Sequence, residues 1–209
     1  VDDGGLKKFD VILANPPWNQ KGYSEKVLRV AKYRERFRFG FSPPKSADWA
    51  WIQHMIASSK EKGRIGVIVD NGALFRGGAE ANIRRRIVEL DIIECIILTP
   101  SKIFYNTDAP GVIIIFNMDK PPERRGKILF IDASEEYVQH PSVKRLNFIP
   151  TSGIEKIVDV YRKFIEIPGF SSIVSLDLLR ANNYNLNVTI YIKQPEAKEN
   201  IDIVSIYKE

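Results

Sequence analysis

Short apolar runs, rich in valine and isoleucine, alternate along this chain with stretches of helical spacing. Apolar runs that lack a polar alternation are typical of strands covered on both faces. Strands that alternate with helices predict an α/β fold, in which helices cover both faces of one sheet. The runs lie at residues 9–14, 65–69, 92–98, 112–116 and 128–131.

Three helices are expected between and after these strands. Asp48 is placed to cap a helix that carries apolar residues on one face and ends at Gly63. Two more helices are predicted over residues 79–89 and 154–165, where apolar residues recur at helical spacing. From Leu176 onward the sequence is polar and its structure is ambiguous.

The composition is that of an ordinary globular protein. Of 209 residues, 44% are hydrophobic and 27% are charged, which excludes disordered, collagen-like and coiled-coil classes. Lys and Arg outnumber Asp and Glu by 31 to 26, a net charge of +5 that allows a nucleic-acid partner without requiring one. No apolar stretch approaches the roughly 18 residues of a membrane span, and no signal peptide is recognisable. A cytoplasmic protein without a membrane partner is therefore expected.

Cysteine and histidine are too few for most metal and disulfide chemistry. The single cysteine, Cys95, excludes a disulfide framework and fits a reducing cytosol. His54 and His140 are far apart in the sequence, so we expect no metal site. Cys95 lies in a predicted strand and is interpreted as a small core residue, and His54 as a structural one.

A chemically distinctive motif, Asn15-Pro16-Pro17-Trp18, directly follows the first apolar run. In an open α/β sheet, ligands bind beyond the carboxyl ends of the strands. The Asn15 side-chain oxygen and the Pro16 carbonyl can both accept hydrogen bonds from one exocyclic amine, Pro17 fixes the backbone, and Trp18 offers a face for a planar base. Two acceptors on one amine favour a tetrahedral nitrogen that can attack a methyl group. The alternative interpretation is a simple turn that ends the strand.

The residues from Asp10 to Trp18 are similar to the catalytic motif of the amino-group DNA methyltransferases that make N6-methyladenine. Further blocks in the same order extend the likeness over nearly the whole chain. Together they resemble the modification subunit of type I restriction-modification systems. These blocks lie at residues 2–9, 38–54, 71–80, 130–134 and 184–187.

The resemblance implies a Rossmann-like methyltransferase sheet of which this chain holds the later strands, the catalytic half, with flanking helices. Residues 1–175 would form the C-terminal half of the catalytic domain, and residues 176–209 the start of a C-terminal tail. Asn15 and Pro16 would polarise the amine of an adenine flipped out of the duplex, and Trp18 would stack on that base.

The resemblance also implies S-adenosylmethionine as the methyl donor. In the family the donor sits mainly on a glycine-rich segment that precedes the catalytic motif. Gly4-Gly5 is not followed by a strand, loop and helix in the required order, so we expect that segment to be absent and the chain to be an inactive fragment that starts at Val1. Asp10 and Asn15 would lie at the edge of the cofactor site.

Four arginines are candidates for contact with double-stranded DNA. Arg34, Arg36 and Arg38 alternate with aromatic residues in the long segment after the motif, a pattern that suits phosphates and bases; a solvated loop is the alternative. Arg76, before a glycine pair at a helix start, could help to hold a phosphate, although a capping turn explains it equally well. The arginine run 84–86 indicates a solvated helix face.

One departure from the family pattern is local: Asp70 stands where family members commonly have proline, at the expected rim of the pocket. The implied protein partners are a specificity subunit and a restriction subunit. Two other functions stay open. The chain could be a non-catalytic module that only contacts DNA or another subunit, or it could methylate an RNA base or a glutamine amide.

Overall fold

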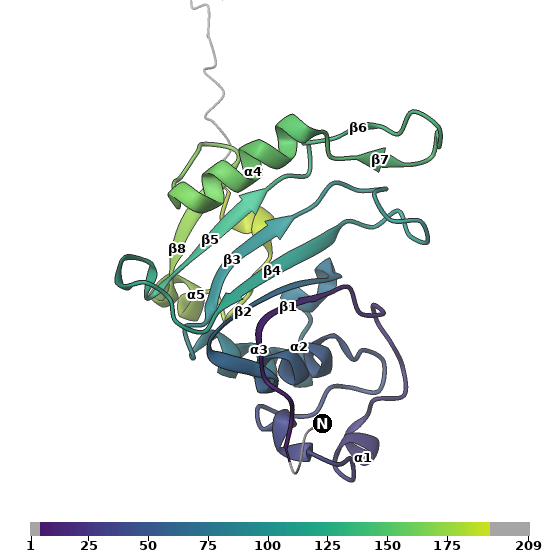
Figure 1. Ribbon diagram of the computed structural model, residues 1–209, viewed down its shortest axis with the longest axis vertical. Coiled ribbons are helices and arrows are strands. Elements are labelled where there is room, and N and C mark those ends of the chain that lie inside the picture. The colour runs from purple at the N-terminus through teal and green to yellow at the C-terminus, as the bar shows by residue number, and fades with distance from the viewer. Residues whose placement is uncertain (1–4, 193–209) are drawn as a thin grey trace, which may run out of the picture.

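The computed structural model describes residues 5–192, and its centre is one six-stranded sheet (Figure 1). The strand order is β1-β2-β4-β3-β5-β8. The pairs β1–β2 and β3–β5 are parallel, and the other three pairs are antiparallel. The strands are β1 (Phe9–Ala14), β2 (Ser59–Asp70), β3 (Ile93–Leu98), β4 (Gly111–Asn117), β5 (Lys127–Asp132) and β8 (Ser171–Ser175).

Helices cover both faces of the sheet, which confirms the predicted α/β arrangement (Figure 1). The α-helices are α1 (Glu25–Leu28), α2 (Asp48–Ala57), α3 (Ala79–Val88), α4 (Thr151–Lys163) and α5 (Leu176–Ala181). Short 3-10 turns are η1 (Arg34–Phe37), η2 (Asn71–Leu74), η3 (Pro122–Arg124) and η4 (Val188–Ile190). A small hairpin pairs β6 (Val138–Gln139) with β7 (Asn147–Phe148). None of the helices within residues 5–192 is long and apolar enough to cross a bilayer.

The central strand β3 is buried at every position, because each of its two faces meets a separate apolar layer. Ile96 and Leu98 pack into the larger core with α2, α3 and α5. Cys95 and Ile97 point to the opposite side, into a smaller core that includes Val160 of α4. Side chains alternate between the faces of a strand, so an uninterrupted apolar run is what this position in the sheet requires. Cys95 is a buried core residue, as predicted.

The predicted end of the helix that begins at Asp48 was wrong. The helix α2 ends at Ala57, and β2 already begins at Ser59, so Gly63 lies inside a strand. The intervening residues 60–62 are charged and exposed at the start of β2. The apolar pattern did not predict this part of the strand, because such a pattern detects only residues that pack against a core.

The first strand was predicted to be buried, and this was also wrong. β1 forms one edge of the sheet, and Val11 and Leu13 are 61% and 80% exposed. Only the alternate residues Ile12 and Ala14 pack against the larger core. An apolar run shows that both faces can be covered, but the run itself does not identify what covers them.

The polar stretch after Leu176 belongs to the larger core within the described residues. Leu179, Leu186 and Val188 are fully buried there. The backbone N–H of Leu186 donates to the Leu74 carbonyl, 3.0 Å away, and so ties this stretch to the turn after β2. Residues 193–209 lie outside the described structure, and the proposed division of the chain at residue 175 stays a prediction.

Neighbouring leucines of α5 provide a test of this packing. Leu179→Ala should lower the free energy of unfolding by about 2–5 kcal/mol, because Leu179 has no exposed surface and its loss leaves a cavity. Leu178→Ala is the matched control, with an expected loss below about 1 kcal/mol, because Leu178 is 48% exposed. Urea unfolding of both variants gives the comparison. Equal losses would contradict the assignment of α5 to the core.

Candidate active site

An open pocket of about 830 Å³ lies at the carboxyl ends of β1 and β2. The whole motif Asn15-Pro16-Pro17-Trp18 lines it, together with Asn19 and Asp70. The loop between β3 and β4 forms its other wall through residues 103–107. The motif therefore lies where the general rule for open α/β sheets places a ligand, and Asp70 lies at the expected place on the pocket wall.

The indole ring of Trp18 is held in the wall of this pocket by two contacts. Its N–H donates to the Ile68 carbonyl at 3.3 Å, and its ring meets Phe104 at 4.6 Å between centroids and 71° between planes. Gly111 makes this packing possible, since a Cβ there would lie 2.8 Å from the Trp18 ring and 2.9 Å from Phe104. A side chain at position 111 would therefore push the two aromatic rings apart.

The acceptor atoms of the motif are available to a ligand. The Asn15 side chain is exposed at the pocket. Within residues 5–192, neither its amide nor the Pro16 carbonyl takes part in a hydrogen bond. Two free oxygens at the end of one strand are what a ligand amine with two N–H donors requires.

A buried carboxylate, that of Asp48, holds the end of the motif. Its Oδ1 accepts a hydrogen bond of 3.0 Å from the backbone N–H of Asn19, the residue after Trp18. Its Oδ2 pairs with a guanidinium nitrogen of Arg76 at 3.1 Å. We predicted Asp48 as the cap of α2, but it is the first residue of that helix and its side chain makes no capping bond. Its carboxylate instead joins the motif to the rest of the fold.

Arg76 connects three carboxylates around this point. Besides Asp48, its guanidinium forms an ion pair with Asp70 and lies 3.5 Å from Glu80. Asp70 also accepts the backbone N–H of Gly72 at 3.1 Å. One side chain thus links the pocket wall to the end of the motif. The proposed DNA contact of Arg76 stays a prediction; within the described residues its guanidinium contacts these carboxylates and the Ser46 hydroxyl.

The carboxyl group of Glu80 is almost fully buried beside this arginine. Burial raises its pKa above the ordinary value, and the charge of Asp48 adds to this effect, while Ser46 and Arg76 oppose it. The Ser46 hydroxyl lies 2.8 Å from Glu80 and 3.1 Å from Asp48. Its single proton can serve only one of the two carboxylates at a time. A proton on Glu80 would therefore satisfy this cluster better than three charged carboxylates.

A second arginine, Arg84, is hydrogen-bonded to the backbone of Arg76. It is buried, and its guanidinium donates to the Arg76 carbonyl at 2.9 Å and to the Tyr184 carbonyl at 2.8 Å. Burial lowers its pKa to about 10, opposed by the charge of Glu80. The expectation of a solvated face for residues 84–86 was therefore wrong for Arg84. Its bonds to backbone carbonyls are invisible to a pattern of charges along the sequence.

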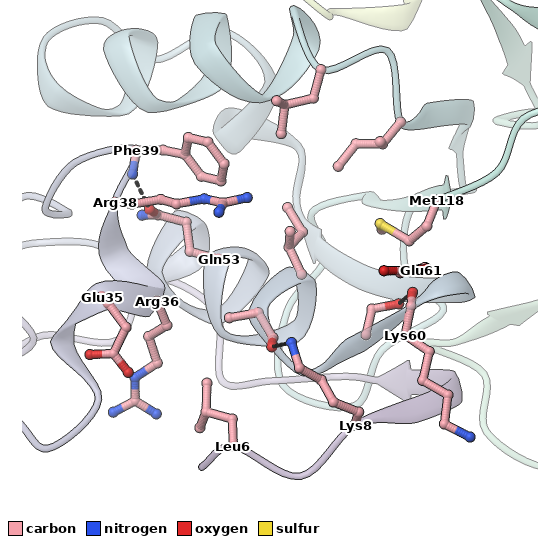
Figure 2. A pocket seen from close by; sticks show the side chains of 15 residues that line it. Leu6, Lys8, Glu35, Arg36, Arg38, Phe39, Gln53, Lys60, Glu61 and Met118 are labelled. Atoms are coloured by element: carbon pink, nitrogen blue, oxygen red, sulfur yellow. Dashed lines mark hydrogen bonds between the residues drawn. The ribbon is translucent and has the colours of Figure 1, made fainter.

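The arginines of the segment after the motif lie elsewhere. Arg36 and Arg38 line a second pocket, of about 570 Å³, at the amino ends of β1 and β2 (Figure 2). Asn15 lies at the other end of these strands, after the last residue of β1. Arg34 is exposed on η1. The structure does not bring these three residues to the motif, and their contact with DNA stays a prediction.

Arg36 and Arg38 contact other side chains of this chain. A guanidinium nitrogen of Arg36 lies 3.1 Å from Nδ1 of His54, and Arg38 stacks 4.8 Å above the ring of Phe39. Burial and the charge of Arg36 lower the pKa of His54. This contact agrees with the structural role expected for His54.

The two residues expected near the cofactor are separated. Asp10 is exposed near the start of β1 and pairs with Lys60 at 2.8 Å, whereas Asn15 follows the other end of that strand. Their role at the edge of a cofactor site stays a prediction. Within residues 5–192, no group of three or more Asp, Glu, His or Cys side chains is arranged to hold a metal ion.

The aromatic wall from the β3–β4 loop was missed by the sequence analysis. Phe104, Tyr105 and Asn106 line the pocket beside the motif, although they are about ninety residues away in the chain. Two adjacent aromatic residues in a long loop after a strand were the available signal. Sequence alone does not show that this loop and the motif meet at one sheet edge.

The sequence of this chain is similar to those of known proteins. Residues 2–200 match the model of a family described as N-6 DNA Methylase. The chain is 49% identical over 206 residues to the type I restriction enzyme MjaVIII methylase subunit of Methanocaldococcus jannaschii, covering 98% of this chain and 35% of the relative. It is 51% identical over 201 residues to the MjaVII methylase subunit of that organism, covering 94% and 34%.

A solved structure carries the same fold. The methyltransferase subunit of a type I restriction-modification system from Streptococcus thermophilus superposes with a TM-score of 0.80 at 32% identity, covering 90% of this chain and 39% of that one. This likeness confirms the Rossmann-like methyltransferase fold that the resemblance implied. The chain spans 34% to 39% of the length of these three relatives.

Removal of the buried carboxylate tests its support of the motif. Asp48→Ala should lower the free energy of unfolding by about 3 kcal/mol, because the Asn19 N–H and Arg76 each lose a buried partner. Asp10→Ala also removes an ion-paired aspartate, but an exposed one, and should cost less than about 1 kcal/mol. Urea unfolding measures both, and similar losses would argue against a structural role for Asp48.

The burial of Glu80 predicts a pH dependence. Its folded pKa lies above the ordinary 4.5, so the stability that it contributes is fully present below that pH and is lost as the pH rises through the folded pKa. Glu80→Gln stays neutral at every pH. The variant should therefore gain stability relative to the parent chain as the pH rises from about 4.5 through the folded pKa of Glu80. Unfolding free energies across this range measure the difference; a constant difference would contradict the raised pKa, and exposed Glu61→Gln is the control.

Proposed function

The chain belongs to the family of N-6 DNA methylases, and from this premise we propose that it forms the base-binding side of an adenine-N6 DNA methyltransferase site. The whole protein would be the modification subunit of a type I restriction-modification system, as its relatives are named. The observation that carries the proposal is the pair of free oxygens, on Asn15 and Pro16, beside the aromatic wall of Trp18 and Phe104.

The motif would act by orienting the amine of the target adenine. The Asn15 side-chain oxygen and the Pro16 carbonyl each accept one N–H of that amine. Both hydrogen bonds draw the nitrogen away from the plane of the ring, so its lone pair leaves conjugation and becomes nucleophilic. No general base is needed before the attack, since the methylated nitrogen carries a positive charge and then releases its extra proton readily.

The base itself would be held by stacking. An adenine inside a duplex is inaccessible, so it must be flipped into the pocket. Trp18 would provide the stacking face, and its two fixed contacts, to Ile68 and Phe104, keep that face in place without a bound base. A fixed aromatic ring loses little conformational freedom when the base arrives, which favours binding.

S-adenosylmethionine is the methyl donor that we propose, since it supplies an activated methyl group on a sulfonium. The donor also carries an adenine, a ribose and an amino-acid group, each of which needs polar partners. The pocket wall carries polar side chains, among them Asn19, Asn106 and Thr107, whereas Asp70 is already paired with Arg76. We assign the binding of the donor to none of these residues.

The partners follow from the same proposal. The substrate would be double-stranded DNA, and a specificity subunit would select the sequence that is methylated. A restriction subunit would complete the assembly, which would act in the cytoplasm. The names of the relatives, methylase subunits of type I restriction enzymes, support this proposal.

The role of Asn15 can be tested in the whole methylase subunit that contains this chain, assembled with its specificity subunit. Asn15→Ala should lower the rate of methyl transfer to adenine by at least about a hundredfold, because one of the two polarising acceptors is lost. DNA binding should persist. The rate is measured as N6-methyladenine formed in a single turnover, by mass spectrometry.

The matched control is Asn82→Ala, which removes the same group from an exposed position on α3. This variant should methylate at the parent rate. Full activity of Asn15→Ala would refute the assigned role and favour the alternative that the chain only contacts DNA or another subunit.

A further inference from the structure

The hairpin formed by β6 and β7 is bonded to the loop that lines the candidate active site. The backbone N–H of Asn147 donates to the Lys102 carbonyl at 2.8 Å, and its side chain donates to the Ser101 carbonyl at 3.1 Å. The guanidinium of Arg145 donates to the Tyr105 carbonyl at 2.8 Å. Tyr105 lines the pocket, so the hairpin is bonded directly to a residue of the pocket wall.

The hairpin has an ordered tip of its own. The backbone N–H of His140 donates to the Leu146 carbonyl at 2.8 Å, and Leu146 is buried beneath the tip. Nδ1 of His140 accepts the backbone N–H groups of Ser142 and Val143 at 3.2 and 3.1 Å. The tip therefore presents its side chains from a fixed backbone.

Positive charge predominates on this surface, which we define as residues 101–110 and 138–148. Lys102, Lys144 and Arg145 are exposed, and Asp108 is the one acidic residue within these two segments. Among the described residues, neither Lys102 nor Lys144 forms an ion pair. Lys102 has φ of 58°, in the left-handed region that favours glycine or asparagine, so a lysine occurs where the backbone favours other residues.

This surface lies at the same end of the strands as the candidate active site. The hairpin and the β3–β4 loop project from the same edge of the sheet (Figure 1). The motif Asn15–Trp18 lies at that edge, whereas Arg36 and Arg38 lie at the opposite one. Any duplex that delivers a base to the pocket must have its backbone beside the pocket mouth. Cations at that place can neutralise the flanking phosphates.

We propose that residues 101–110 and 138–148 form a DNA-backbone contact surface, in which Lys102 and Lys144 bind phosphates next to the flipped adenine. Arg145 has a different part, since its bond to the Tyr105 carbonyl fixes the hairpin against the pocket loop. The surface rests on the proposed function, because it assumes that DNA enters this pocket. Exposed Tyr137, Val138 and Phe148 give the hairpin an apolar side as well, so contact with a protein subunit is the competing outcome.

The test removes the two lysine charges in the whole methylase subunit assembled with its specificity subunit. The double variant carries Lys102→Asn, which suits the left-handed backbone, and Lys144→Gln. Binding of a duplex that contains the target site is measured over a range of salt concentrations. Each lost phosphate contact should reduce the slope of log K against log salt by about 0.9, so the double variant should lose about 1.8.

The matched control carries Lys62→Gln and Lys127→Gln, which remove two exposed charges at the amino ends of β2 and β5. Its slope should equal that of the parent enzyme. Thermal unfolding verifies that both double variants are folded, and size-exclusion chromatography verifies that both assemble with the specificity subunit.

The outcomes separate this proposal from the proposed function. An unchanged slope in the Lys102 and Lys144 variant overturns the contact surface, and so does a loss of assembly, which would assign the hairpin to a protein partner. If Asn15→Ala still lowers methylation by at least about a hundredfold in the single-turnover assay, the proposed function stands without the surface. If Asn15→Ala retains full activity, the proposed function itself fails.

Discussion

The contact between Asp48 and Arg76 holds together the segments on which the candidate site depends. Asp48 begins α2 and fixes the end of the motif through the Asn19 N–H. Arg76 follows the turn after β2 and joins that carboxylate to Asp70 and Glu80. Removal of Arg76 would leave the fully buried carboxylate of Asp48 without its counter-charge, which is costly in a protein interior. The motif is therefore positioned by side chains outside itself.

The sheet determines what this cluster can hold in place. Parallel pairing of β1 with β2 brings the motif beside Asp70, and antiparallel pairing of β2 with β4 brings Gly111 to the same edge. The absence of a side chain at Gly111 lets Phe104 approach Trp18 from the loop between β3 and β4. The aromatic wall thus needs three strands in this order, although it consists of two rings.

Much of this architecture could be predicted, for a clear reason. The apolar runs of β3, β4 and β5 were recognisable because core strands must be apolar on both faces, and the motif was recognisable because it follows such a run. The start of β2 was missed because its exposed residues 60–62 are charged. Burial of Arg84 was missed because its partners are backbone carbonyls, which every residue type provides.

The sequence by itself determined the fold class, the position of the motif at a strand end and the family resemblance, because these depend on residue types close together in the chain. The tertiary structure decided which distant residues complete the site. It brought Phe104 and Asp48 to the motif and placed Arg36 and Arg38 at the opposite edge of the sheet. Strand order and loop packing determine these distances in space, and neither is encoded in the spacing of residues along the chain.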